Sequence, residues 1–380
     1  MRKIEEVVRV ASRKDLAETG GGHNQKGVNF QRVWALTRMF ELEKEGHLDF
    51  FFLFETIQDV AELDSSISPS SIRIYQAKKR DRGEWSWKDL TNLLDPARKN
   101  SLVPLGIKNS PIGKLYSTVL AFKELKSSAH FISNAGCNLP LTGGDNAATS
   151  LSCDLSRLDA KYLEPLSESL NTLHDAETFP VDPSLIHIEK VPIPPDSPDI
   201  YLRGVAVTFL TNRSHRHANQ ASALVDALLA KIGPLGAKTD SCSTFDEIKK
   251  ERGFSRDEFA SALGMLEQVP DQESIIESWL KQLLLEGGVD FMEVPRIHIQ
   301  VSRFFQFKLM GVEDPQTVAL ADDIDKWLDS HPPSSGTGTP LKDFLERAKA
   351  DLAELHPSIC ASEYTAHFLL RMAKKCVDPT

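Results

Sequence analysis

The strongest constraint on the fold is a pair of short apolar segments that carry polar side chains at their ends. Residues 50–54 are apolar and lead into Glu55 and then Asp59. A second segment alternates between apolar and polar side chains and contains Gln76 and Lys78. Because residues two apart on a strand point to the same face, Gln76 and Lys78 should emerge side by side. If the two segments pair as a hairpin, Asp59, Gln76 and Lys78 converge at one end of a sheet.

Such a sheet end would supply oxygen ligands together with one ammonium group. Asp59 is the preferred metal-binding carboxylate, although an Asp in a turn often accepts backbone hydrogen bonds instead. Glu55 ends an apolar run, where a charge is costly unless it is paired, bound to a metal or able to reach solvent. Gln76 adds a neutral oxygen ligand in place of an acid, which predicts modest Mg²⁺ affinity. This donor set is typical of Mg²⁺-dependent phosphodiesterases.

Two interpretations are open for each of the candidate side chains Lys78 and Gln31. Lys78 either stabilises developing negative charge and orients the attacking water, or is an edge-strand lysine that protects against aggregation. Gln31 lies in the preceding helical segment. It either faces the cluster, holding a metal-bound water or a phosphate, or is a partly buried helix residue. Glu62 and Asp64 follow Asp59 in an expected loop and should be solvated.

Composition limits the class of protein. With 380 residues the chain should form two or three domains, and its longest apolar runs are far too short to span a bilayer. The start of the chain lacks the apolar stretch of a secretory signal, so we expect a cytosolic protein with no membrane partner. The five cysteines form no Cys-x-x-Cys pair, which argues against a structural zinc site.

Charge is distributed unevenly along the chain. The formal net charge of −10 argues weakly against nucleic-acid binding, because phosphate contacts require cations. Residues 73–130, however, contain twelve Lys or Arg and five acidic residues, an excess of seven positive charges. This basic segment begins at the candidate site, where DNA would have to lie. The alternative is a solvated surface whose charge is balanced elsewhere.

The first half of the chain shows an α/β pattern. Residues 27–45 have helical spacing of apolar side chains, and Gly46 should end that helix. The two strand segments follow, joined by a polar loop over 64–71. Residues 85–127 look mostly helical, 129–133 resemble a strand and 150–176 look helical. This order predicts a small mixed sheet flanked by helices.

The second half should be a mostly helical α+β region. The Pro-rich segment 192–198 is either a linker or a stiff excursion within one domain. We expect strands at 201–210 and 297–307, helices between them, and a flexible break over 331–340. The expected domains are 1–191 with the candidate site, 200–330 for oligomerisation and partner binding, and a helical tail over 341–380. The tail has an apolar stripe formed by Leu341, Phe344, Leu345, Ala348, Leu352 and Leu355. It either reaches a neighbouring chain or packs onto its own domain.

Residues 27–36, Phe54-Glu55 with Asp59-Val60, and Tyr75-Gln76-Ala77-Lys78 together resemble a known family. It is the double-stranded DNA endonuclease domain of antiphage effectors, found in CBASS systems and in nucleases paired with a HerA-type hexameric ATPase. Both belong to the restriction-endonuclease-like PD-(D/E)xK superfamily. The resemblance covers about residues 18–190 and rests on the order and spacing of short motifs.

The resemblance implies roles for five residues. Asp59 matches the metal-binding acid, Gln76 the variable acid position, and Lys78 the catalytic lysine. Glu55 matches the acid that precedes the Asp, and Gln31 matches a helix position often held by Glu. The implied cofactor is Mg²⁺, with Mn²⁺ as the other candidate. Residues 200–380 are short for the sensor domain of cyclic-nucleotide-activated relatives, which favours control by a HerA-type ATPase or by homo-oligomerisation.

The sequence therefore predicts a restriction-endonuclease-like nuclease domain followed by an assembly domain. Its function would be hydrolysis of double-stranded DNA phosphodiesters in antiphage defence, controlled by assembly with a partner ATPase. The alternative is a non-catalytic DNA-binding or scaffold subunit with a degenerate nuclease fold. Gln76 in place of an acid keeps that alternative open.

Overall fold

The structure is a computed structural model whose described residues divide into two compact units. The first unit comprises 1–205 and 231–259, and the second comprises 206–230 and 260–380. The described residues are 2–13, 15–16, 25–97, 106–174, 180–213, 220–235, 242–267, 272–310, 314–331 and 340–377. The expected break over 331–340 therefore lies almost entirely outside the described residues. The return of residues 231–259 to the first unit was not predicted from the sequence.

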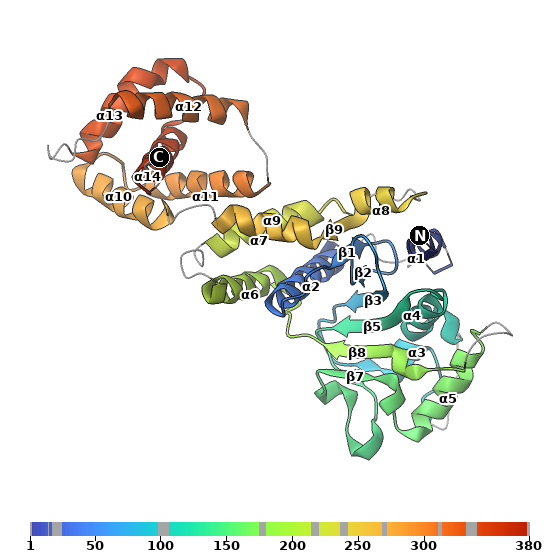
Figure 1. Ribbon diagram of the computed structural model, residues 1–380. Helices are drawn as coiled ribbons and strands as arrows, with labels where there is room; N and C mark the ends of the chain where they lie inside the picture. Colours follow the sequence, from blue (N-terminus) through green and yellow to red (C-terminus); the bar gives the residue numbers. More distant parts are fainter. Residues whose placement is uncertain are drawn as a thin grey trace. The chain divides into compact units, whose positions relative to one another are not determined.

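A seven-stranded mixed sheet forms the centre of the first unit, with the strand order β7-β8-β5-β3-β2-β1-β9 (Figure 1). Neighbouring strands β3, β5 and β8 are parallel to one another, and the remaining pairs are antiparallel. The strands are β1 (Phe51–Phe54), β2 (Val60–Leu63), β3 (Ser71–Lys78), β5 (Lys126–Ser133), β7 (Ser152–Asp154), β8 (Ile186–Lys190) and β9 (Gly253–Ser255). Two short strands, β4 (Trp85–Ser86) and β6 (Cys137–Asn138), pair separately. The mixed α/β class is confirmed.

Helices cover both faces of this sheet, as Figure 1 shows. Ile72 and Ile74 of β3 pack into an apolar core that includes Leu115 of α4 (Pro111–Leu120). On the opposite face, the ring of Tyr75 lies 4.4 Å from the ring of Trp34 on α2 (Gln25–Lys44). This division follows from the alternation of side chains along β3. The other helices of this unit include α1 (Arg2–Ala11), α3 (Trp87–Thr91), α5 (Ala160–Asn171) and α8 (Phe245–Arg252).

The expected helix over 27–45 is confirmed as α2, and Gly46 beyond its end has a φ of +79°. That left-handed conformation is one that glycine adopts at a helix end without steric cost. The loop over 64–71 is also confirmed, because the Asp64 carboxylate accepts hydrogen bonds from the Ser70 and Ser71 amides. The strand expected at 129–133 is β5, which begins three residues earlier. The prediction of helices over 85–127 and 150–176 is correct only in part, since both stretches also contain strands.

The expected direct pairing of residues 50–54 with 72–78 is wrong. Strand β2 lies between β1 and β3 and pairs with both of them in antiparallel fashion. Glu62 is therefore a strand residue and is buried, whereas the sequence had indicated a solvated loop position. The reason is that β2 contains only four residues, Val-Ala-Glu-Leu, which is too short for alternation to reveal a strand.

Two strands expected in the second half are helices instead. Residues 201–210 lie in α6 (Pro198–Arg213), and 297–307 lie in α11 (Val294–Met310). Burial follows helical spacing, since Ile297, Val301 and Phe305 are buried while Ile299 is 63 % exposed. The other helices are α7 (Ala221–Ile232), α9 (Arg256–Glu267), α10 (Gln272–Glu286), α12 (Pro315–Ser330), α13 (Leu341–Leu352) and α14 (Ala361–Val377).

The apolar stripe of the expected tail packs into its own unit. Leu345, Ala348 and Leu352 are buried in the same core as Trp327 and Phe368. Leu341 and Phe344 pack against this core, whereas Leu355 is 63 % exposed, so most of the stripe stabilises the chain's own fold. Within the described residues, no helix combines the length and the apolar character needed to cross a membrane.

Candidate functional site

The structure brings Asp59, Gln76 and Lys78 together on one face of the sheet. Val60 of β2 lies opposite Tyr75 of β3, so the preceding residue, Asp59, lies opposite Gln76. Asp59 and Gln76 are only 2 % and 1 % exposed, whereas the Lys78 side chain is partly exposed. The register thus places a buried carboxylate beside a buried amide, with a lysine two residues further along the same strand face.

Asp59 is anchored by two described interactions. One carboxylate oxygen, Oδ2, accepts a hydrogen bond of 2.8 Å from the Ala77 amide and lies 3.6 Å from Lys78 Nζ. A buried carboxylate is stable only when it is paired or hydrogen-bonded, and both conditions hold here. The sequence-based prediction that Asp59 and Lys78 lie close together is therefore met in the structure, whatever their role.

The turn before Asp59 is conformationally unusual. Glu55 and Gln58 have φ values of +48° and +58°, a region that residues other than glycine rarely occupy. Gln58 holds this turn in place, because its Nε2 donates to the Leu16 carbonyl at 2.7 Å and to Thr118 Oγ1 at 3.2 Å. Strained backbone of this kind is commonly found at functional sites.

A backbone hydrogen bond joins Glu55 to Asp59. Its amide donates to the Asp59 carbonyl at 3.0 Å, and its own carbonyl accepts from Arg252 Nη1 at 2.9 Å. The residue is exposed to solvent. Burial lowers the pKa of Arg32 on α2, and the negative charge of Glu55 opposes that shift. Glu55 is therefore held next to Asp59 by its backbone and lies within electrostatic range of α2.

Gln31 is buried on α2, one turn before Trp34. Since α2 contacts β3 through Tyr75, it covers the face opposite to that of Gln76 and Lys78. The described geometry therefore brings Gln76 and Lys78 to Asp59 but associates Gln31 with the other side of the sheet.

The donor set suits a hard divalent cation. Asp59 and Gln76 contribute carboxylate and amide oxygens, and Mg²⁺ is often held by only one or two protein carboxylates together with waters and substrate phosphate. Across the described ranges, no group of three or more His, Cys, Asp and Glu side chains lies close enough to hold a metal ion by itself. The residues present therefore fit a site that substrate phosphate helps to complete.

Basic residues lie beyond the carboxyl ends of the parallel strands. Lys78 of β3 is in register with Ser133 of β5, which is in register with Lys190 of β8. Just after Lys78, Arg80 lies 4.5 Å above the Trp85 ring and forms an ion pair of 3.0 Å with Asp89. Part of the positive charge excess noted in the sequence is thus located at the edge that carries Lys78.

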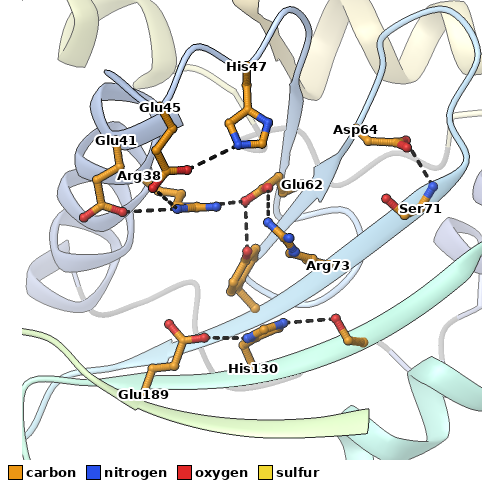
Figure 2. A network of polar contacts seen from close by, with 12 residues as sticks. Arg38, Glu41, Glu45, His47, Glu62, Asp64, Ser71, Arg73, His130 and Glu189 are labelled. Atoms are coloured by element: carbon orange, nitrogen blue, oxygen red, sulfur yellow. Dashed lines mark hydrogen bonds and ion pairs between the residues drawn. The ribbon is translucent and has the colours of Figure 1, made fainter. Parts of the chain in front are cut away.

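A second polar network on the opposite sheet face was missed from the sequence (Figure 2). Buried Glu62 accepts from Tyr75 Oη at 2.8 Å, from Arg73 Nη1 at 2.9 Å and from Arg38 Nε at 3.3 Å. Burial, and then the Glu62 charge, raise the pKa of Tyr75 well above its usual value. One detectable signal was the charged pair formed by Glu62 and Arg73 in short apolar segments, since buried charges require partners.

This network continues along β5 and β8. His130 Nδ1 lies 2.6 Å from Glu189 Oε1, and His130 Nε2 lies 3.0 Å from Ser128 Oγ. The imidazole of His187 stacks on that of His130, with ring centres 4.6 Å apart. These groups line a cavity of about 670 Å³ on the α2 side of the sheet.

Glu189 should make stability depend on pH. Burial would raise its pKa, but the hydrogen bond and charge of His130 together hold it below the usual value. A depressed folded-state pKa contributes stability above the unfolded pKa, about 4.3, and that contribution is lost as pH falls below it. We expect Glu189→Gln to lower the melting temperature at pH 7 and to have little effect near pH 3. Thermal unfolding from pH 7 to 3 measures this, and a constant difference at all pH values would contradict it.

Comparison with known proteins yields one family. The family described as "Cap4, dsDNA endonuclease domain" matches residues 19–233, which is more than half of the chain. The match includes Asp59, Gln76 and Lys78 together with the strands that carry them. Neither a curated protein nor a solved structure gives a significant match.

Proposed function

Because the chain belongs to the Cap4 dsDNA endonuclease domain family, we propose that it is a Mg²⁺-dependent endodeoxyribonuclease of an antiphage defence system. The substrate would be the phosphodiester backbone of double-stranded DNA. The observation that carries the proposal is the buried Asp59 carboxylate, opposite Gln76 and 3.6 Å from the Lys78 ammonium. Acidic and amide oxygens beside a lysine are the groups that metal-assisted phosphodiester hydrolysis requires.

Each residue has a distinct role in this proposal. Asp59 and Gln76 would hold Mg²⁺, and Glu55 would add a carboxylate from the strained turn, although its position at the cluster rests on the backbone contact with Asp59. When bound, the ion would act as a Lewis acid on the phosphate. Lys78 would stabilise negative charge that develops on the phosphate oxygens or orient the attacking water. Gln31 would have at most an accessory role, because α2 lies on the other sheet face. Mn²⁺ could replace Mg²⁺, since both favour oxygen ligands.

A plasmid-nicking assay tests the proposal. We expect supercoiled DNA to be nicked and linearised when Mg²⁺ is present, and to remain intact when EDTA is present. DNA binding without cleavage, under Mg²⁺ and Mn²⁺ alike, would instead support a non-catalytic DNA-binding or scaffold subunit. This distinction is necessary because Asp59 is the single buried carboxylate among the described residues assigned to the site, and Gln76 stands where an acid is common.

Substitutions at Gln76 should test whether its side chain is a ligand of the metal ion. Gln76→Glu adds a carboxylate and should lower the Mg²⁺ concentration required for half-maximal cleavage, whereas Gln76→Ala removes an oxygen ligand and should raise it. The measurement is a Mg²⁺ titration of the cleavage rate for each variant. An unchanged Mg²⁺ dependence in both variants would place Gln76 outside the metal site.

We also propose that the second unit controls the nuclease through homo-oligomerisation and docking of a HerA-type hexameric ATPase. In support, several large apolar side chains at the end of α10 and in the segment that follows it are exposed, including Leu285 at 88 % and Phe291 at 72 %. Exposed apolar side chains grouped in this way often mark protein interfaces. Clustering many nuclease sites on one DNA molecule would raise their effective concentration.

Assembly can be measured by light scattering on the full chain. We expect a species larger than a monomer at micromolar concentration and dissociation in a Leu285→Asp, Phe291→Asp double variant. Leu48→Asp is the matched control, because Leu48 is equally exposed but lies in the first unit. A monomeric wild-type protein that also fails to co-purify with an ATPase encoded beside it would refute this part of the proposal.

A further inference from the structure

The cavity on the α2 side of the sheet contains a Ser–His–Glu relay. Ser128 and His130 lie two residues apart on β5, so their side chains share a face. Glu189 belongs to the neighbouring strand β8, in which His187 is the register partner of His130. The relay has a hydroxyl at one end, an imidazole in the middle and a carboxylate at the other end.

Hydrogen-bond chemistry fixes the protonation pattern of this relay. Burial would raise the pKa of Glu189, but the hydrogen bond from His130 and the nearby positive charges together lower it, so the carboxylate is ionised at neutral pH and can only accept. Nδ1 of His130 must therefore carry the proton that it donates to Glu189 across 2.6 Å. In the neutral ring, Nε2 is then an acceptor, and the Ser128 hydroxyl, 3.0 Å away, donates to it. With its hydrogen bonds in these directions, the imidazole can remove the proton from the serine hydroxyl.

The surroundings of Ser128 also favour a reaction at its hydroxyl group. Ser128, His130 and Glu189 all line the cavity of about 670 Å³, a volume sufficient for a small organic substrate. Arg73 of β3 is the register partner of Ser128 and lines the same cavity. One Arg73 nitrogen binds Glu62 at 2.9 Å, and a guanidinium group has further N–H donors. The register thus places a positively charged residue on the strand next to that of Ser128, on the wall of the same cavity.

We propose that this cavity is a second catalytic site, in which Ser128 is the nucleophile for hydrolysis of a small carboxylic ester. Ser128 Oγ attacks the carbonyl carbon while its proton passes to His130 Nε2. The bond between the carbonyl carbon and the ester oxygen breaks, and the leaving alkoxide takes that proton. Water then attacks the acyl-serine with His130 as the base, which releases the acid and restores Ser128. Glu189 orients the imidazole, and Arg73 stabilises the oxyanion.

This site is independent of the proposed nuclease centre. Tyr75, His130 and His187 are register neighbours whose rings lie on the α2 side of the sheet. Gln76 and Lys78 have the opposite parity on β3, so they face the side covered by α4. Failure of ester hydrolysis would therefore leave the nuclease proposal intact, and loss of DNA cleavage in Asp59→Ala would not affect Ser128.

Covalent labelling of the full chain provides the test. A fluorophosphonate probe should attach to Ser128 Oγ with loss of fluoride, and peptide mass spectrometry should locate the adduct there. We expect Ser128→Ala to abolish that adduct and His130→Gln to slow its formation by about 100-fold or more. Glu189→Gln should slow labelling less strongly and shift its pH dependence, a change that a purely structural role would not produce. Hydrolysis of p-nitrophenyl acetate should follow the same order.

Ser127→Ala is the matched control, because the Ser127 hydroxyl donates to the Val119 carbonyl and takes no part in the relay. It should be labelled as fast as the wild type. Thermal unfolding of each variant should be measured to check that the fold is retained. Absence of any adduct on the folded wild type, an adduct on another residue, or unchanged labelling in His130→Gln would each overturn the proposal.

Discussion

Replacing Asp59 with alanine should reduce cleavage of double-stranded DNA by about a thousandfold or more without unfolding the protein. Among the described residues assigned to the candidate nuclease site, Asp59 supplies the only buried carboxylate, so none of the others can take its place as a buried acidic ligand. Its removal should also take away the negative charge that lies 3.6 Å from the Lys78 ammonium. The loss should persist at saturating Mg²⁺, because a missing ligand alters the site as well as its affinity.

Lys78→Ala should produce a loss of similar size, and Lys79→Ala is its control. Lys79 forms an ion pair of 2.8 Å with Asp81 and, as the next residue, does not share the strand face of Lys78. Cleavage rates with circular dichroism spectra of all three variants provide the comparison. Folded Asp59→Ala and Lys78→Ala proteins that cut DNA at the wild-type rate would show that the assigned site is not the catalytic one.

The largest effect on stability is expected at Glu62. Glu62→Ala should lower the free energy of unfolding by about 3–5 kcal/mol, the usual cost of removing one partner from a buried ion pair. Glu62 accepts hydrogen bonds from Arg38, Arg73 and Tyr75, and Arg38 is itself mostly buried. The substitution would remove the acceptor that the Tyr75 hydroxyl and two guanidinium groups share on the wall of the cavity.

Glu41→Ala is the matched control, because Glu41 pairs with the same Arg38 at 3.3 Å but is half exposed. Exposed ion pairs contribute at most about 1 kcal/mol, so this variant should remain close to the wild type. Urea unfolding of both variants measures the two free energies. Equal effects of the two substitutions would show that the burial of Glu62 does not determine its contribution to the free energy of unfolding.

The sequence was informative where side chains alternate over a sufficient length. Strand β3 has eight residues, and its alternation correctly predicted that Gln76 and Lys78 share a face. The helical spacing of α2 and its glycine end were similarly clear. Asp59 could be associated with them because it follows an apolar run of strand length.

Other features depend on contacts that a local pattern does not encode. Four-residue β2 shows too little alternation to be recognised as a strand, so buried Glu62 was read as a loop residue. In α11, apolar side chains occur at both strand and helix spacing, and only tertiary packing decides that Val301 is buried and Ile299 is exposed. The relay of Ser128 and His130 with Glu189 joins residues about 60 positions apart, which requires the parallel pairing of β5 and β8.

The position of β9 has a consequence for biosynthesis. This strand pairs Ser255 with Phe51 of β1 and forms the edge of the sheet, so the sheet is completed by residues about 200 positions after its first strand. At roughly 5–20 residues per second, a ribosome needs about 10–40 s to make that stretch. Until then, the outer edge of β1 should remain unpaired on the nascent chain. We therefore expect the unit that contains Asp59, Gln76 and Lys78 to reach its final form only after residue 259 has left the ribosome, so that its activity arises when most of the chain exists.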